Sequence, residues 1–253
     1  MPKVSIAFGL INIPVKTETA ARKDSISFNM LCPTCLGRSS QKLVCHTCND
    51  RELKRDETVS GYEFKKGQFV TVTKEELKAC EPDSNSVFEI ELTVSAEEVD
   101  PLLFETSYYL TPDAGGAKGY ALLLKALEEE GLYAIARATM SRREHVIIIR
   151  PYNGCLAFHT MFFASEVSAV PSLGLEAITL KEAELSLARQ LLRVNAGPFE
   201  HGSYADGYQT RVEDLLQTKQ AGATYEAPKK AEKKAEMGDL LEMLAASLKT
   251  KAA

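Results

Sequence analysis

The chain has 253 residues, of which 45% are hydrophobic and 26% are charged. This balance allows a sizeable core and excludes an intrinsically disordered, collagen-like or membrane-embedded chain. The apolar stretch at residues 4–13 is interrupted by Asn12 and ended by Pro14, so it favours neither a signal peptide nor a membrane span. We therefore expect a cytoplasmic protein with one large core and C-terminal extensions.

The net charge of −5 is distributed unevenly along the sequence. Residues 67–133 hold most of the acidic excess, whereas residues 16–66 and 137–150 are basic. Two interpretations are open at this point. The basic stretches converge on one surface that binds nucleic acid, or they are ordinary solvated faces.

The first two thirds of the sequence predict a β-rich core. Period-2 alternation, or runs rich in Val, Ile and Phe, predict strands at residues 4–13, 26–28, 68–73, 87–94, 108–110, 133–140, 145–150 and 155–163. Thr73 and Glu76 have the spacing of a capping box and predict a short helix after Thr73. A second helix is predicted from Gly119 to a stop at Gly131.

After Pro171 the pattern becomes helical. Apolar residues at helical spacing predict amphipathic helices at 180–194 and 208–220. Residues 222–238 are rich in Ala, Lys and Glu, which predicts a flexible linker. The last predicted helix, within 239–253, is too short to be stable alone and therefore indicates docking to a partner. Its apolar stripe is formed by Leu240, Leu241, Leu244 and Leu248.

Four of the six cysteines form two C-x-x-C pairs, Cys32 with Cys35 and Cys45 with Cys48. Such pairs supply four thiolates at a spacing typical of a closed, structural tetrahedral Zn²⁺ site. A metal ion also explains how residues 31–56 are ordered, because this segment has no periodicity of its own. We predict one structural zinc ion per chain, with redox-active or unligated thiols as the alternatives.

No catalytic motif is present, since the sequence lacks a phosphate-binding P-loop, an H-E-x-x-H motif and a nucleophile elbow. Gly115, Gly116 and Gly119 lack the spacing of a dinucleotide-binding loop and predict a turn before a helix. The polar residues 142–145 are interpreted as a charged turn. We predict that the protein is not an enzyme.

An ordered series of segments resembles the prokaryotic Ku family, the DNA-end-binding proteins of non-homologous end joining. The series includes SIAFGLINIPVK, GYEFKKGQFVTVTKEEL, AIARATMSRREHVIIIRP and GPFEHGSYADGYQTRVEDLLQTKQAG, and it covers nearly the whole chain. The resemblance implies a β-rich α+β fold with a Ku-type β-barrel core, a long bridge insertion and C-terminal helices. It also implies a ring-shaped homodimer that threads duplex DNA ends and recruits a multidomain ATP-dependent DNA ligase for double-strand break repair.

The patterns and the resemblance together predict the organisation of the chain. The predicted parts are a barrel core at 1–178 that includes a Cys₄ zinc knuckle and basic arm at 30–66, a helical arm at 179–221, the linker 222–238 and a ligase-docking helix at 239–253. Dispersed cations suit phosphate contacts that are independent of base sequence. The candidates for DNA contact are Arg22, Lys23, Arg38, Lys42, Lys54, Arg55, Lys65, Lys66, Arg142 and Arg143.

Two other classes of protein remain open. One is a zinc-ribbon regulator that binds nucleic acid or protein without forming a ring. The other is a metal-dependent hydrolase that uses the region of His145 and His159. Because a net charge of −5 is acidic for a DNA-binding protein, we expect any end binding to depend steeply on salt. We expect the protein at DNA breaks in the nucleoid, with no membrane partner.

Overall fold

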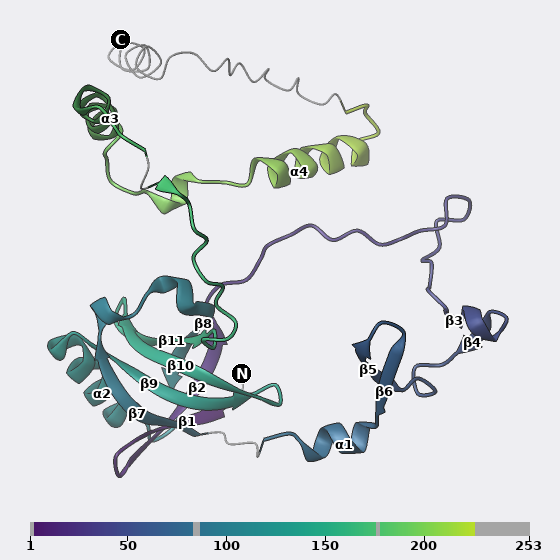
Figure 1. The fold of residues 1–253 in the computed structure, drawn as a ribbon, viewed down its shortest axis with the longest axis horizontal. Helices are drawn as coiled ribbons and strands as arrows, with labels where there is room; N and C mark the ends of the chain where they lie inside the picture. Colours follow the sequence, from purple (N-terminus) through teal and green to yellow (C-terminus); the bar gives the residue numbers. More distant parts are fainter. Residues whose placement is uncertain (1–2, 83–86, 176–177, 226–253) are drawn as a thin grey trace. The chain divides into compact units, whose positions relative to one another are not determined.

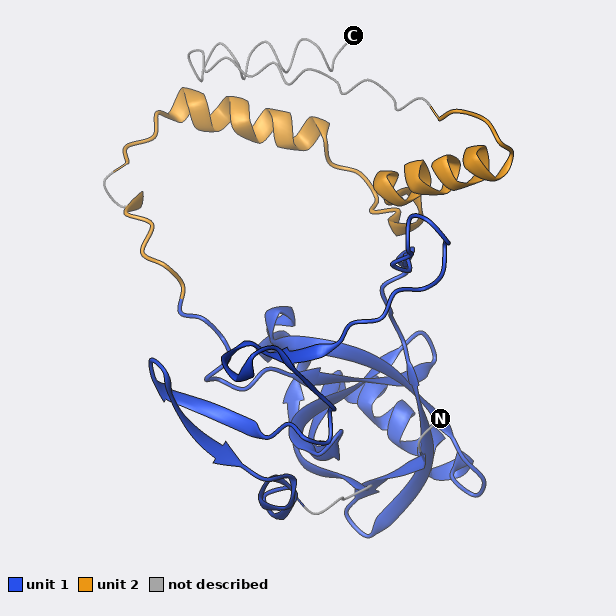
Figure 2. Ribbon diagram, turned by 90° about the vertical axis from the view of Figure 1, so that its right-hand side faces the viewer, with its two compact units in different colours: residues 1–169 blue, residues 170–253 orange. Residues whose placement is uncertain are grey.

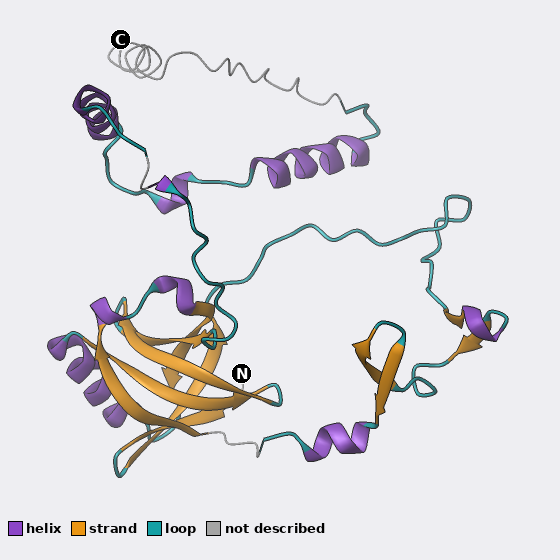
Figure 3. Ribbon diagram, viewed as in Figure 1, coloured by secondary structure: helices purple, strands orange, loops and turns teal. Residues whose placement is uncertain are grey.

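Seven strands in the N-terminal part of the chain form a closed β-barrel. The computed structural model describes residues 3–82, 87–175 and 178–225 (Figure 1). In the described residues the barrel order is β1 (Lys3–Phe8), β2 (Ile11–Thr19), β8 (Phe104–Pro112), β11 (Cys155–Met161), β10 (Arg143–Tyr152), β9 (Leu132–Met140) and β7 (Val87–Ser95) (Figure 3). Neighbouring strands are antiparallel except β1 and β7, whose parallel pairing closes the barrel. The predicted β-barrel core is therefore confirmed.

The chain divides into two compact units, residues 1–169 and 170–253, which Figure 2 shows in blue and orange. The first unit contains the barrel and ends at Ala169, whereas 178 is the predicted end of the core. None of the described helices is long and apolar enough to cross a membrane.

Apolar side chains fill the barrel at every second position of its strands, as period-2 alternation requires. β9 contributes small residues such as Ala136, and β10 contributes the larger Ile147 and Ile149, all fully buried. Phe88 of β7 packs edge-on against Phe158 of β11, with ring centroids 5.1 Å apart. The small residues of β9 leave volume for these large side chains, so the interior is a packed core and not a channel.

Helix α2 (Ala117–Glu130) packs on the barrel core through Tyr120, Leu123 and Leu127. It ends at Gly131, whose φ of 64° is the left-handed conformation of a helix C-terminal cap. Both the predicted helix and its predicted stop are confirmed.

The turn before α2 requires glycine, because its backbone is left-handed at Gly115 and lies close to the backbone of Pro14 at Gly116. Gly115 has a φ of 81°, and a Cβ added at Gly116 would lie 2.4 Å from the carbonyl oxygen of Pro14. Asp113 of the same turn accepts a hydrogen bond from the Lys16 ammonium group at 2.9 Å. This contact holds the pKa of Asp113 well below its usual range. The turn therefore joins α2 to β2, in agreement with the structural role predicted for these glycines.

A long insertion, residues 20–86, connects β2 to β7, and we call it the arm. Its elements are β3 (Leu43–Cys45), β4 (Arg51–Leu53), β5 (Ser60–Lys65), β6 (Gln68–Val72) and α1 (Lys74–Ala79). β3 pairs with β4 and β5 pairs with β6, each as a separate two-stranded sheet. None of the described arm residues, 20–82, is buried. The arm thus has no hydrophobic core of its own.

Two local predictions in the arm have opposite outcomes. The capping box is confirmed, because Thr73 Oγ1 accepts from the backbone N–H of Glu76 and the Glu76 carboxylate accepts from the N–H of Thr73 at 2.8 Å. The predicted strand at 26–28 is wrong, because these residues pair with no other strand. Alternation over three residues indicates an extended chain but does not supply a pairing partner.

The second unit contains α3 (Glu182–Val194) and α4 (Gly207–Gln220), in agreement with the two predicted amphipathic helices. Asp206 caps α4 by accepting from the backbone N–H groups of Tyr208 and Gln209. Among the described residues 170–175 and 178–225, only Val212 is buried. Most of the predicted linker, and all of the predicted docking helix at 239–253, lie outside the described residues.

The Tyr120 hydroxyl group joins α2 to two barrel strands. It donates to the carbonyl oxygen of Leu110 and accepts from the N–H of Leu156, both at 2.7 Å. Tyr120→Phe should lower the free energy of unfolding by about 1–3 kcal/mol, because two buried backbone groups lose their partner. Urea denaturation measures this change. Tyr152→Phe, at an exposed ring, is the control, and an equal loss in both variants would contradict the role assigned to the hydroxyl group.

Candidate nucleic-acid interface

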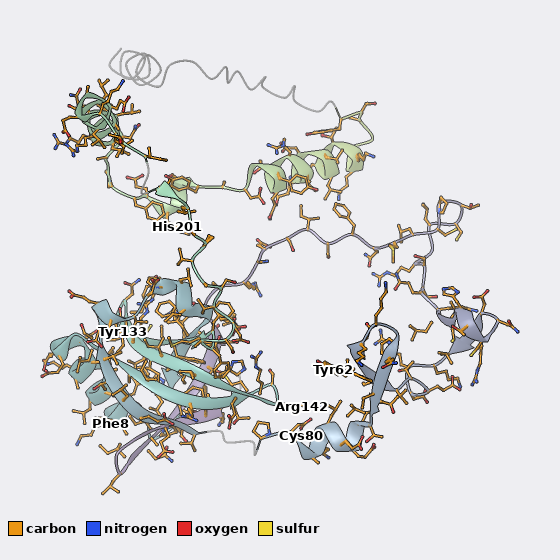
Figure 4. All side chains as sticks on the ribbon, viewed as in Figure 1. Phe8, Tyr62, Cys80, Tyr133, Arg142 and His201 are labelled. Atoms are coloured by element: carbon orange, nitrogen blue, oxygen red, sulfur yellow. The ribbon has the colours of Figure 1, made fainter. Side chains whose placement is uncertain are left out.

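The β5–β6 hairpin presents cations at its tip and apolar side chains along its strands. Lys65 ends β5, and the turn continues through Lys66 and Gly67, whose N–H donates to Glu63 at 2.7 Å. Four large apolar side chains of this hairpin are more than half exposed, namely Tyr62, Phe64, Phe69 and Val70. Figure 4 shows Tyr62 on this hairpin. The hairpin can therefore offer positive charge at its tip and an apolar surface behind it.

All ten cations predicted to contact DNA are exposed, but they differ in their ion pairing. Lys42 contacts Glu52 at 2.6 Å, Arg142 contacts Glu81 at 3.3 Å, and Arg143 contacts Glu166. Among the residues that the structure describes, the other seven have no carboxylate within ion-pair distance; they are Arg22, Lys23, Arg38, Lys54, Arg55, Lys65 and Lys66. These seven candidate cations all belong to the arm.

The turn between β9 and β10 holds Arg142 at its tip. Ser141 and Arg142 have φ values of 51° and 67°, a two-residue hairpin turn with both central residues left-handed. In Figure 4, Arg142 lies beside Cys80, and the ion pair with Glu81 joins this turn to the end of the arm. The guanidinium group of Arg143 also lies 5.7 Å from the ring of Phe163. These residues form a charged turn, as predicted. The carboxylates and the aromatic ring that they contact belong to the same chain.

The cysteines are brought together within each C-x-x-C pair. The Cys32 sulfur accepts from the backbone N–H groups of Cys35 and Thr34, which lowers the pKa of Cys32 to about 7. The Cys45 sulfur interacts mainly with the Cys48 side chain, and the pKa of Cys45 is also lowered. In the described part of the chain, no three Cys, His, Asp or Glu side chains lie close enough to hold a metal ion. The zinc site therefore stays a prediction.

His159 forms a buried polar network on the barrel. Its Nε2 accepts from Arg150 Nε at 2.8 Å, so the ring proton is on Nδ1, which lies 2.8 Å from Ser107 Oγ. Phe104 stacks on the imidazole with centroids 4.4 Å apart. Burial, with a smaller effect from the Arg150 charge, lowers the pKa of His159 to about 4. Both ring nitrogens are occupied, which argues against a hydrolase that uses His159 as a base or metal ligand.

The barrel and the arm match a known family. A family model described as the Ku70/Ku80 beta-barrel domain matches residues 7–187. The chain belongs to the Ku family. Three similar proteins are each named "Non-homologous end joining protein Ku". Those from Koribacter versatilis, Anaeromyxobacter sp. strain K and Pseudomonas aeruginosa are 42%, 40% and 33% identical, over 96%, 96% and 99% of this chain and 83%, 83% and 88% of the relative.

Membership in the Ku family confirms the resemblance seen in the sequence. Ku proteins are DNA-end-binding scaffolds of non-homologous end joining and not enzymes, so the prediction of a non-enzymatic protein is also confirmed. The matched range of the Ku model, residues 7–187, includes the whole arm.

Sequence reasoning missed strand β5 and its exposed aromatic residues. Tyr62 and Phe64 alternate with Glu63 and Lys65, and Gly67 marks a turn before β6. This pattern is typical of a hairpin and was sufficient to predict one. The aromatic residues of this Ku arm are exposed in the single chain, which makes them candidates for contact with a partner.

Proposed function

We propose that this Ku protein forms a ring-shaped homodimer that threads the ends of duplex DNA without reading base sequence. The single observation that carries the proposal is the match of residues 7–187 to the Ku family model. This range contains the closed barrel and the arm, whose described residues form no core. In this proposal the dimer protects DNA ends at breaks in the nucleoid. Each arm also holds one structural zinc ion on its four cysteines.

The exposed apolar surface of the arm supports dimerisation. Isolated two-stranded hairpins are marginally stable in water, and the β5–β6 hairpin buries none of its residues. Phe28 and Met30, near the start of the arm, are also more than 60% exposed. Tyr62 and Val70 are directly opposite each other in the β5–β6 ladder, so their side chains share one face of the hairpin. An exposed apolar face indicates a protein interface. A second copy of the chain, with its own arm, supplies a matching apolar surface in a symmetric dimer.

The distribution of charge supports binding to the phosphate backbone. The unpaired cations are dispersed along an extended arm, where they can contact successive phosphates. A closed ring loads only where the duplex terminates, so specificity for ends follows from topology and needs no base contacts. A zinc-ribbon regulator without a ring is less well supported, because the cysteines lie inside an arm that is itself part of the Ku barrel match.

Recruitment of an ATP-dependent DNA ligase is proposed for residues 239–253. The apolar stripe of this segment, Leu240, Leu241, Leu244 and Leu248, has the spacing of a helix that docks in a groove. A chain that ends at residue 238 should bind DNA ends as the full chain does but no longer stimulate end joining by the ligase. Gel-shift and ligation assays on the same samples test this, and full stimulation by the shortened chain would contradict the docking role.

Threading is tested by competition between linear and covalently closed circular duplex of equal length. We expect a homodimer in solution that binds the linear form at least tenfold more tightly, because a closed circle offers no end on which to load. Light scattering gives the oligomeric state, and gel shift gives the affinities. A monomer, or equal affinity for both forms, would contradict the ring.

The unpaired lysines at the hairpin tip should contribute more to DNA binding than a lysine that is already paired. Lys65→Ala combined with Lys66→Ala should reduce the slope of log affinity against log salt by about 2, the loss expected for two phosphate contacts. Lys42→Ala is the control, because Lys42 contacts Glu52 at 2.6 Å. A larger effect at Lys42 than at the tip would show that the tip does not contact phosphate.

A further inference from the structure

The two-residue turn between β9 and β10 has an arginine where the backbone favours glycine. Ser141 and Arg142 have φ values of 51° and 67°, and Met140 pairs with Arg143 on either side of them. Turns of this kind usually contain Asn and Gly, because a Cβ is unfavourable at both central positions. Strained backbone of this kind clusters at functional sites. The side chain of Arg142 is 79% exposed, so burial does not explain its place in the turn.

Arg142 and its neighbour Arg143 are held to different degrees. The guanidinium group of Arg143 donates a hydrogen bond to Glu166 and lies 5.7 Å from the ring of Phe163. The Glu166 carboxylate also accepts from the N–H of Phe163 at 2.8 Å, so Arg143 belongs to a closed set of contacts. Within the described residues, Arg142 donates no side-chain hydrogen bond, and its Nη1 lies 3.3 Å from Oε1 of Glu81 as an ion pair. The donors of Arg142 are therefore available to another acceptor.

Glu81 is placed beside Arg142 by the end of helix α1. Its N–H donates to the carbonyl oxygen of Lys78 at 3.2 Å, which extends the last turn of the helix. The Glu81 side chain is 30% exposed, and in the described part of the chain its carboxylate pairs with Arg142 alone. A carboxylate and a phosphate both offer anionic oxygens that a guanidinium group can bind. Glu81 thus takes the place of an anionic ligand at Arg142.

Acidic side chains limit the direction from which a phosphate can reach this ion pair. Pro82, which follows Glu81, is part of the lining of a hollow on the outer face of the barrel. Three carboxylates and one cation also line it, namely Glu89, Glu91, Glu144 and Arg137. The carboxylates outnumber the cation and repel phosphate. The tip of the turn, where Arg142 meets Glu81, is therefore the favoured point of approach for a DNA backbone.

We propose that Arg142 binds a phosphate of the duplex backbone in exchange for Glu81, and that Glu81 is an internal competitor that lowers the affinity for DNA. The proposal rests on the DNA binding included in the proposed function. It separates the two arginines of the turn, because Arg143 keeps its contacts with Glu166 and Phe163 when DNA binds. It also adds a carboxylate to the residues that set DNA affinity.

The exchange is tested by a double-mutant cycle on the full chain, with gel-shift affinities for a linear duplex. Glu81→Gln should tighten binding about two- to fivefold, the usual contribution of an exposed ion pair. Arg142→Gln should weaken binding about tenfold, the loss of a charged hydrogen bond. In the Arg142→Gln background, Glu81→Gln should have little further effect, because the competitor no longer has a site to occupy.

The control for charge alone is Glu129→Gln, which removes the same charge from the exposed ion pair of Lys125 with Glu129 on α2. This variant should leave the affinity for DNA unchanged. Equal tightening by Glu81→Gln in both backgrounds would overturn the competition. Unchanged affinity in Arg142→Gln would overturn the phosphate contact.

A functional origin of the strained turn is tested by Arg142→Gly. Glycine adopts a positive φ without strain, so this variant should unfold at a higher urea concentration than the unchanged protein. It should nevertheless weaken DNA binding as Arg142→Gln does. A lower urea midpoint together with unchanged DNA affinity would show that Arg142 only stabilises the turn, and would overturn the proposal.

Salt dependence separates the two arginines of the turn. Arg142→Gln should reduce the slope of log affinity against log salt by about 1, the loss of one phosphate contact, whereas Arg143→Gln should leave the slope unchanged. Lys125→Gln, which removes a cation from α2, should also leave it unchanged. A larger loss of slope in Arg143→Gln than in Arg142→Gln would overturn the assignment.

Comparison of linear and covalently closed circular duplex separates this inference from the proposed function. Equal affinity for both forms, with the expected coupling between Glu81 and Arg142, would contradict the ring alone. Preference for the linear form without that coupling would contradict the exchange alone. Failure to bind either form would contradict both.

Discussion

The parallel pairing of β1 with β7 is the interaction on which the first unit depends. Ser5 of β1 is opposite Pro14 of β2 on one side and opposite Val87 of β7 on the other. The strand before the arm and the strand after it are therefore held on either side of one strand. This pairing fixes the two strands that flank the arm in one barrel, and the packed barrel core offsets the entropy lost in closing so long a connection. The arm can extend from the barrel because its ends are fixed there.

An extended arm cannot be stabilised in the way that the barrel is. Its described residues bury nothing, so burial of apolar surface contributes little to its order in a single chain. Local devices fix individual elements, such as the capping box at Thr73. Longer-range order requires a connection from outside the local sequence. The second chain that we propose against the β5–β6 hairpin would be such a connection.

Local sequence patterns predicted the elements whose causes are local. Period-2 alternation located most of the barrel strands, and Gly131 located the end of α2, because each depends on residues within one element. The single strand predicted at 4–13 is wrong, because a turn at Gly9 and Leu10 divides this stretch between β1 and β2. The closure of the barrel was implied by the resemblance alone, since the parallel pairing of β1 with β7 joins residues far apart in the sequence. The strand predicted at 26–28 failed for the same reason, because a strand needs a partner that its own sequence does not specify.

The candidate site shows the same division between local and non-local causes. Exposure of the ten cations was predictable from their type, because charged side chains are rarely buried. Their pairing was not, since the partners of Arg142 and Arg143 come from distant segments. The hydrogen bonds of His159 likewise depend on Ser107 and Arg150, which are placed beside it only by the strand order.

The distribution of charge in the fold explains how a chain with a net charge of −5 can belong to a family that binds DNA. Glu89 and Glu91 of β7 are exposed on the barrel, and Arg137 pairs with Glu91 at 2.9 Å. The last turn of α2 adds the exposed residues Glu128, Glu129 and Glu130. Like charges repel phosphate, so these surfaces disfavour non-specific contact with the duplex. The seven candidate cations that have no carboxylate partner in the described residues lie on the arm, so positive charge is available there although the total charge is negative.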